Sequence, residues 1–297
     1  GLVLDLRNNG GGVLKSATDI ADEFLTANKV IVSTKGTHSP EKKYVSTSAG
    51  MLEKTKLVVL INENSASASE ILAGALQDHD RATIIGRRSF GKGLVQEDVS
   101  LRDGSNLRLT IARYYTPTGR CIQKSYDGSV EDYYHEQSER FSNGELYAPD
   151  STLFVDSLKF VTPKGKVVYG GGGIMPDVFV PLDTIGSSWY LTQLRYSMAF
   201  QSFAFDFANK KRTAWKTTKD FTENFSISDG LLNEFIRYSK SYFEIKFDER
   251  DFNTSKTLMK QLLKAEIGRQ LWTENGFYHV INKSDKEILK AIQLVRK

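Results

Sequence analysis

Apolar residues in the first third of the chain follow two spacings, one typical of strands and one typical of helices. Short apolar runs are each followed by a turn and then by apolar residues three or four positions apart. In chain order we expect a strand over 2–6, a helix marked by 13–25, a strand over 57–61, a helix marked by 71–76 and a strand over 83–85. This alternation predicts βαβ units in an α/β fold with a mostly parallel sheet. Candidate chemistry therefore belongs at the turns between strands and helices.

Beyond Gly93 the pattern changes from helical spacing to strict alternation. Two alternating runs, 94–101 and 107–115, flank a turn with the Asp-Gly signal, so we expect a hairpin appended to the sheet. Residues of about 124–170 are polar and punctuated by Gly and Ser, which predicts a surface excursion with an edge strand at 167–169.

The length of 297 residues predicts two domains, at roughly 150 residues for each. We place an α/β domain at 1–185 and a mainly helical region at 186–297, where the composition turns helical and aromatic. Hydrophobic residues make up 40% of the chain and aromatic residues 11%, as in globular proteins. The net charge of +4 is spread along the chain, so the sequence predicts neither a nucleic-acid partner nor an anionic membrane surface.

Cys121 is the single cysteine, which excludes an internal disulfide and a metal site built from several cysteines. No stretch reaches the roughly 18 apolar residues of a membrane span, and no signal peptide opens the chain. The sequence begins within an expected strand and without methionine, which suggests a processed product or a piece of a longer protein.

Two glycine-rich segments resemble nucleotide-binding loops and fail their requirements. Residues 86–92 fit the first seven positions of a phosphate-binding loop, but Gly93 stands where a Ser or Thr should meet magnesium, and a strand follows instead of a helix. Residues 10–12 miss the dinucleotide fingerprint because Lys15 occupies the place of its third glycine. We therefore expect no nucleotide cofactor, and we expect 10–12 to expose backbone N–H groups.

Ser67 is the candidate nucleophile because it lies between small residues where a strand ends and a helix begins. The Ala68 N–H would lie at the positive end of that helix, where it could stabilise an oxyanion. The alternative is a capping box, in which the Ser67 hydroxyl and Glu70, three residues later, only satisfy the helix start.

A nucleophilic serine needs a base, and the four histidines do not serve. His79 would lie about 18 Å along the helix from Ser67, and the others fall in polar loops or in the helical region. Lys92 is the better candidate, because desolvation in its glycine-flanked turn could keep its amine neutral. Gln96 shares a strand face with Lys92 and could orient it, whereas the plainer interpretation makes Lys92 a solvated turn residue.

Two segments also carry a family resemblance. The sequence NSASASEI at 64–71 and the sequence FGKGLVQ at 90–96 resemble the serine and lysine signatures of the C-terminal processing peptidases, or tail-specific proteases. Lys92 follows Ser67 by 25 residues and Gln96 follows Lys92 by four, which matches the arrangement in that family. Further similar stretches lie at 4–9, 113–120 and 171–177, within a resemblance that spans about residues 1–183.

The resemblance implies an α/β sandwich of the ClpP/crotonase type and a serine endopeptidase that cleaves proteins near unstructured C-terminal tails, without metal or nucleotide. Relatives are usually exported, which implies a periplasmic or cell-envelope location. They also carry a PDZ domain that grips the tail, and this chain lacks it, so we expect the catalytic portion alone. Gly10 departs from the proline that is common in relatives. The helical region after residue 186 resembles the tails of envelope-associated members, where an oligomer or adaptor contact could form.

The resulting hypothesis is a Ser-Lys dyad, in which Ser67 attacks and neutral Lys92 acts as base and then as acid. Gln96 orients Lys92, while the N–H of Ala68 and that of Gly11 or Gly12 hold the oxyanion. One alternative is a non-catalytic peptide-binding or scaffold protein that retains the fold. Another is a crotonase-like acyl-CoA enzyme, which gives no role to a buried lysine beside a serine.

Overall fold

The computed structural model describes residues 1–48, 50–126, 128–149 and 156–296. Contacts divide the chain into two compact units, one of Gly1–Leu182 with the C-terminal residues from Lys290 on, and one of Asp183–Leu289. We call them the catalytic unit and the helical unit. The sequence boundary was expected at 185/186 with all later residues in the helical region, so the structure differs in returning the C-terminal segment to the catalytic unit.

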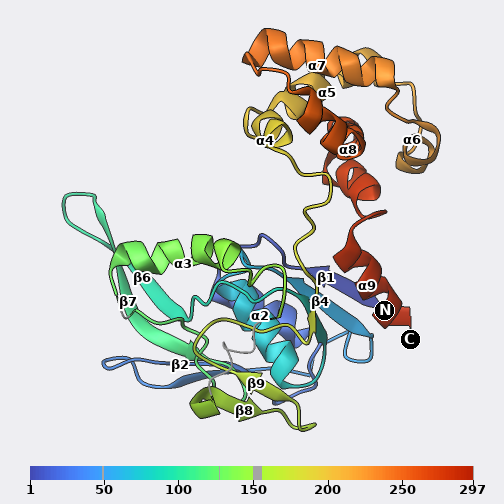
Figure 1. The fold of residues 1–297 in the computed structure, drawn as a ribbon. Coiled ribbons are helices and arrows are strands. Elements are labelled where there is room, and N and C mark those ends of the chain that lie inside the picture. The colour runs from blue at the N-terminus through green and yellow to red at the C-terminus, as the bar shows by residue number, and fades with distance from the viewer. Residues whose placement is uncertain (49, 127, 150–155, 297) are drawn as a thin grey trace. The chain divides into compact units, whose positions relative to one another are not determined.

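A four-stranded parallel sheet forms the first layer of the catalytic unit (Figure 1). The prediction of a parallel sheet is confirmed. Its strands, in spatial order, are β1 (Leu2–Asp5), β4 (Leu57–Ile61), β5 (Thr83–Gly86) and β10 (Val178–Phe179). All five residues of β4 are buried, as is typical of a central parallel strand that is covered on both faces.

A second four-stranded sheet is antiparallel and separate from the first. Its strands, in spatial order, are β3 (Lys42–Val45), β2 (Val30–Lys35), β7 (Asn106–Tyr115) and β6 (Leu94–Ser100). The hairpin of β6 and β7 was predicted, but its attachment to the parallel sheet was wrong, because β7 pairs with β2. β2 and β3 were missed, since polar residues interrupt their apolar pattern.

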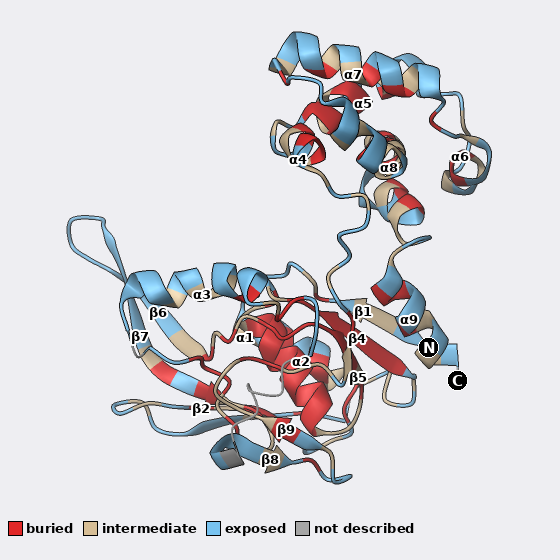
Figure 2. Cartoon of the chain, in the orientation of Figure 1, coloured by how far each residue is buried: buried red, intermediate tan, exposed pale blue. Residues whose placement is uncertain are grey.

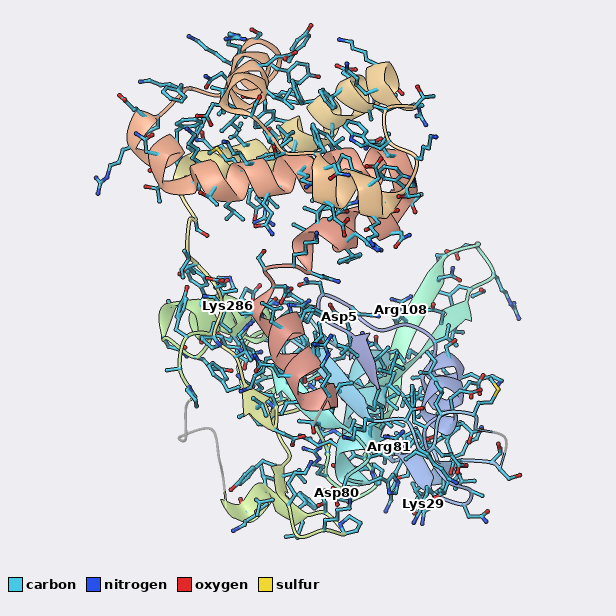
Figure 3. The ribbon with its side chains drawn as sticks, turned by 90° about the vertical axis from the view of Figure 1, so that its right-hand side faces the viewer. Asp5, Lys29, Asp80, Arg81, Arg108 and Lys286 are labelled. Carbon is cyan, nitrogen blue, oxygen red and sulfur yellow. The ribbon has the colours of Figure 1, made fainter. Side chains whose placement is uncertain are left out.

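The core lies where both sheets meet α1 (Leu14–Asp22) and α2 (Ala68–Asp78). Every residue of α2 is buried, so this helix is enclosed on all sides (Figure 2). The turn after α2 is fixed by Arg81, whose guanidinium donates to the carbonyl oxygens of Phe24, Leu52 and Thr55 at 2.6 to 2.8 Å (Figure 3). α2, which begins directly after Ser67, is therefore buried along its length and held at its C-terminal end.

The predicted surface excursion contains more regular structure than its composition indicated. It includes α3 (Val130–Ser142), a 3₁₀ turn at Asp156–Leu158 and the two-stranded sheet of β8 (Lys159–Val161) and β9 (Val167–Tyr169). The sequence did not predict α3, because the aromatic residues in it are largely exposed and give no apolar stripe. The helix begins after Ser129, which is its N-terminal capping residue.

The helical C-terminal region is confirmed, with a core rich in aromatic side chains. Its helices are α4 (Trp189–Tyr196), α5 (Ala199–Lys211), α6 (Thr218–Asn224), α7 (Asp229–Phe243), α8 (Glu249–Ile281) and α9 (Lys286–Arg296). α8 is kinked at Trp272 and Thr273, which have non-helical backbone angles. Among the described residues, no helix combines the length and the apolar character that a membrane span requires.

Candidate active site

All six residues predicted from the sequence to form the site line one cavity of the catalytic unit, with a volume of about 570 Å³. The cavity lies where the glycine turn after β1, the start of α2 and the beginning of β6 meet. Its lining consists of Gly10, Gly11, Gly12, Val13, Leu14, Ser67, Ala68, Ile71, Lys92, Leu94, Val95, Gln96, Asp98, Arg108 and Tyr114. The fold thus brings together residues that lie as many as 104 positions apart in sequence, from Gly10 to Tyr114.

Ser67 precedes α2 in a strained backbone conformation, with φ of 56° and ψ of −116°. An ordinary helix cap has an extended backbone, so capping alone does not account for this geometry. Ser67 and Glu70 form a capping box, in which the Glu70 carboxylate accepts from the Ser67 N–H at 2.8 Å and the Ser67 side chain faces the Glu70 N–H. A strained residue at a strand-to-helix turn is typical of a nucleophile that is held out toward the substrate.

Gly11 lies against the start of α2, with φ of +87°. A Cβ atom at this position would lie 2.6 Å from the Ala68 nitrogen and 2.5 Å from the Ala66 oxygen. Because Ala68 is the first residue of α2, its N–H has no acceptor within the helix. The missing side chain of Gly11 therefore leaves room for an anionic oxygen in front of that N–H.

The two glycines that sequence analysis offered as oxyanion donors differ in their hydrogen bonds. The Gly11 N–H donates to Asn9 Oδ1 at 3.0 Å. In the part of the chain that the structure describes, the Gly12 N–H has no acceptor, and a Cβ added there would meet nothing within 4 Å. Gly12 is therefore the glycine whose N–H is free to bind a ligand.

Asparagine side chains connect the glycine turn to the turn before Ser67. The Asn8 N–H donates to Asn62 Oδ1 at 2.8 Å, and the side-chain amides of Asn62 and Asn64 both donate to Asn8 Oδ1 at 2.9 Å. Asn8 has φ of 57°, a conformation that asparagine tolerates better than most residues. Sequence analysis assigned these residues no role, although an Asn-Asn pair after a strand is a signal for such a turn.

Lys92 lies in the loop that connects β5 of the parallel sheet to β6 of the antiparallel sheet. Its side chain is half-buried, and within the described residues its Nζ makes no ion pair. The loop is tied directly to the nucleophile turn, because the Phe90 N–H donates to the Ser65 oxygen at 2.9 Å. Lys92 therefore lines the cavity from a loop that is tied to the nucleophile turn.

Gln96 lines the same cavity, but its side chain is exposed. Its amide donates to Thr110 Oγ1 at 3.5 Å across the hairpin, and no hydrogen bond to Lys92 occurs among the described residues. The pairing of β6 with β7 shifts by one residue between Val95 and Gln96. Orientation of Lys92 by Gln96 remains a prediction.

Glu70 was considered only as a capping residue, yet it is fully buried beneath both candidate catalytic residues. Its carboxylate accepts from the N–H groups of Ser67, Gly91 and Lys92 and from the Ser89 hydroxyl. Burial raises the pKa of Glu70 above its ordinary value, and these four hydrogen bonds oppose that rise.

Tyr114, in β7, is the second residue whose role the sequence did not reveal. It is buried, and its hydroxyl donates to the carbonyl oxygens of Ser67 and Lys92. Burial also raises the pKa of Tyr114 well above its ordinary value, so the phenol keeps its proton and remains a donor.

The far end of α2 is held by a buried ion pair. Arg120 and Asp78 have fully buried side chains and meet at 2.7 Å, and Asp78 also accepts from the N–H and hydroxyl of Thr118. Within the family-like stretch at 113–120, Thr118 and Arg120 thus have a structural role at the end of α2, whereas Tyr114 contacts Ser67.

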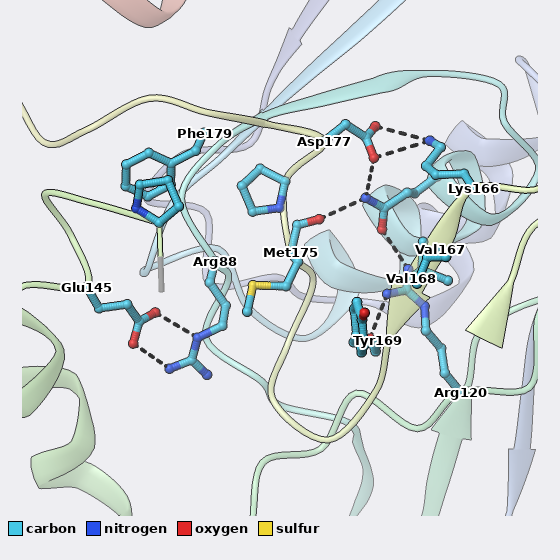
Figure 4. A pocket seen from close by; sticks show the side chains of 13 residues that line it. Arg88, Arg120, Glu145, Lys166, Val167, Val168, Tyr169, Met175, Asp177 and Phe179 are labelled. Atoms are coloured by element: carbon cyan, nitrogen blue, oxygen red, sulfur yellow. Dashed lines mark hydrogen bonds and ion pairs between the residues drawn. The ribbon is translucent and has the colours of Figure 1, made fainter. Parts of the chain in front are cut away.

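A second cavity of the catalytic unit, about 300 Å³ in volume, lies beside β9 and β10 (Figure 4). Its charged side chains are all in ion pairs, Arg88 with Glu145, Lys166 with Asp177, and Arg120 with Asp78 outside the lining. Its lining includes neither Ser67 nor Lys92. In the described residues, His, Cys, Asp and Glu form no group of three that could hold a metal ion.

Two parts of the chain match known families. Residues 1–134 match peptidase family S41, and residues 190–273 match a family of unknown function (DUF8443). A carboxy-terminal-processing protease of Bartonella bacilliformis is 53% identical over 124 residues, 41% of this chain and 28% of that protein. A carboxyl-terminal-processing protease of Synechocystis is 40% identical over 162 residues, 54% of this chain and 37% of that protein.

Among solved structures, the photosystem II D1 C-terminal processing protease is 31% identical, with a TM-score of 0.43 and coverage of 62% of this chain and 36% of that chain. Residues 1–134 are thus similar to peptidase family S41, a family of serine-type peptidases. The relatives that the chain matches within this family are carboxy-terminal processing proteases of bacteria and chloroplasts. The matched segments span only 28% and 37% of the length of the two bacterial relatives described above.

Proposed function

We propose that this chain is the catalytic portion of a serine endopeptidase that cleaves protein substrates near their C-terminal tails by a Ser67–Lys92 dyad. The observation that carries the proposal is the convergence of Ser67, Lys92 and the free N–H groups of Ala68 and Gly12 on one cavity. A nucleophile, a base and oxyanion donors are the three requirements of acyl transfer.

The reaction begins when Ser67 Oγ attacks the carbonyl carbon of the scissile peptide bond and its proton moves to the neutral amine of Lys92. The tetrahedral intermediate collapses, the C–N bond breaks, and Lys92 gives the proton to the departing amine. Water then attacks the Ser67 ester and passes a proton to Lys92. That proton returns to Ser67 Oγ as the new carboxyl product leaves, and Gln96 helps to orient Lys92 throughout.

The negative oxygen of each intermediate accepts hydrogen bonds from the N–H groups of Ala68 and Gly12. We assign the second donor to Gly12 because the Gly11 N–H is already bound by Asn9. Gly11 contributes the space in which the oxygen sits. Loss of one such donor typically lowers turnover about a hundredfold or more.

The apolar part of the cavity supports an apolar substrate residue next to the scissile bond. Its apolar lining comes from Val13, Leu14, Ile71, Leu94 and Val95. An extended, unstructured tail could enter such an open cavity, and the relatives' names refer to processing at carboxyl termini. By the same resemblance we propose a periplasmic or envelope location, a ClpP/crotonase-type sandwich for the catalytic unit, and an oligomer or adaptor contact through the helical unit.

The test uses the full-length protein and an unstructured peptide with an apolar tail. Ser67→Ala and Lys92→Ala should each abolish cleavage. Lys92→Arg should also abolish it, because arginine keeps a positive charge but cannot act as a neutral base. Undiminished turnover in any of the three variants would refute the dyad, and a wild-type protein that never cleaves would instead favour a peptide-binding scaffold.

A further inference from the structure

The two candidate catalytic residues share a carboxylate oxygen. Glu70 Oε2 accepts from the Ser67 N–H and from the Lys92 N–H, each at 2.8 Å. The other oxygen, Oε1, accepts from the Gly91 N–H at 2.7 Å and the Ser89 hydroxyl at 2.5 Å. One buried side chain therefore binds the peptide units of both residues and the loop between them.

A second side chain joins the same two residues from their carbonyl groups. The Tyr114 hydroxyl donates to the Ser67 oxygen at 3.1 Å and, by a short contact, to the Lys92 oxygen. Tyr114 is itself fixed, because its N–H donates to the Gly93 oxygen at 3.0 Å. The N–H and C=O groups of Ser67 and Lys92 are thus bridged separately.

The fold makes such bridges necessary for a dyad. Ser67 precedes a helix packed against the parallel sheet, whereas Lys92 leads into β6 of the antiparallel sheet. Without Glu70 and Tyr114, their separation would depend on the Phe90 N–H to Ser65 oxygen bond and on how the two sheets pack against each other. A misplacement of about 1 Å between reacting groups can cost roughly a hundredfold in rate. The strained backbone of Ser67 also needs surrounding bonds to maintain it.

We propose that Glu70 and Tyr114 are positioning residues that fix the separation of Ser67 and Lys92 by bridging their peptide units. This inference rests on the dyad of the proposed function. Neither side chain takes a proton from the substrate. Their role is to hold in place the peptide units that carry the serine hydroxyl and the lysine amine.

The test compares Glu70→Gln and Tyr114→Phe with the wild-type full-length protein. A fluorophosphonate probe counts the reactive serines, so that kcat is expressed per active site. We expect kcat per site to fall roughly a hundredfold in Glu70→Gln and roughly tenfold in Tyr114→Phe, with KM changed less than about threefold. Tyr114→Phe loses only one oxygen atom, so it keeps the test valid if Glu70→Gln does not fold.

Ile84→Ala is the control for general destabilisation, because Ile84 is buried in β5 and does not line the cavity. It should lower the stability and the number of labelled sites without changing kcat per site. A purely structural role predicts the same behaviour for Glu70→Gln and Tyr114→Phe, and that result would overturn the inference. Ser67→Ala is measured in parallel. If this variant is active, the dyad and the bridging role are both wrong. If it is inactive while Glu70→Gln and Tyr114→Phe keep the wild-type kcat per site, the bridging role alone is wrong.

Discussion

Gly11 lies so close to Ala68 that any side chain there would place its Cβ 2.6 Å from the Ala68 nitrogen. Ala68 is the first residue of α2, the helix that begins directly after Ser67, and its N–H points out of the helix start. A glycine at this position is therefore required by the shape of the cavity and by its φ of +87°.

Replacement of Gly11 by alanine should abolish proteolysis, because the new methyl group would fill the space in front of the Ala68 N–H. The expected loss in kcat is at least about a hundredfold, as for removal of an oxyanion donor. Gly10→Ala is the matched control, since a Cβ at Gly10 meets nothing within 4 Å. Gly10→Ala should therefore cleave the peptide far faster than Gly11→Ala. Equal activity of the two variants would contradict the role of the space at Gly11 in holding the oxyanion.

The assignment of Gly12 as the second oxyanion donor can be tested by removing only its N–H. Gly12→Pro eliminates the donor, whereas Gly12→Ala adds a similar steric group and retains it. We expect kcat of the proline variant to lie about a hundredfold or more below that of the alanine variant. Similar kcat values in single-turnover assays would show that another group stabilises the oxyanion.

The backbone strain at Ser67 predicts an unusual order of stability among inactive variants. Glycine tolerates a positive φ, so Ser67→Gly should be more stable than Ser67→Ala by about 1 kcal/mol, although both lack the hydroxyl. Hydrogen exchange in β4 measures this for the catalytic unit, because all three tryptophans, Trp189, Trp215 and Trp272, lie in the helical unit and their fluorescence reports on that unit. A more stable alanine variant would argue against strain.

Glu70 should make the stability of the catalytic unit depend on pH. Its pKa is raised in the folded protein from an ordinary value of 4.5, so above pH 4.5 the folded state binds more protons than the unfolded state. The stabilising contribution is fully present below pH 4.5 and is lost as the pH rises through the pKa of the folded state.

Glu70→Gln should remove this dependence. Denaturant unfolding is followed by hydrogen exchange in β4 for the wild type and the variant. It gives the difference between their free energies of unfolding at a pH below 4.5 and at neutral pH. The wild type should lose stability relative to Glu70→Gln as the pH rises. A relative gain by the wild type would mean that hydrogen bonding outweighs desolvation at this carboxyl group.

The parallel layer of the fold could be predicted from sequence because its signals are local. β4 is a continuous apolar run and α2 has apolar residues at helical spacing. β2 and β3 could not be predicted in the same way, since they are held by pairing with each other and with β7, distant in sequence. The attachment of the hairpin was wrong for the same reason, because the partner of an edge strand is set by tertiary packing.

In the candidate site, too, only the residues with local signals could be predicted from the sequence. Ser67, Lys92 and the glycine turn are recognisable by their small neighbours and by the resemblance to the family. The local contact of Glu70 with Ser67 was visible as a capping box, but the bonds of Glu70 to the Lys92 loop and those of Tyr114 cross 19 to 47 residues, which no local pattern contains. The Gln96 side chain bonds to Thr110, a contact that alternation along a single strand could not predict.

The most direct test of the central claim is the labelling of full-length protein by a serine-directed fluorophosphonate, followed by mass-spectrometric mapping of the modified residue. We predict modification at Ser67 in the wild type, and little or none in Lys92→Arg, whose guanidinium cannot accept the serine proton. Modification at another serine, or labelling of Ser67 at an undiminished rate in Lys92→Arg, would contradict this prediction.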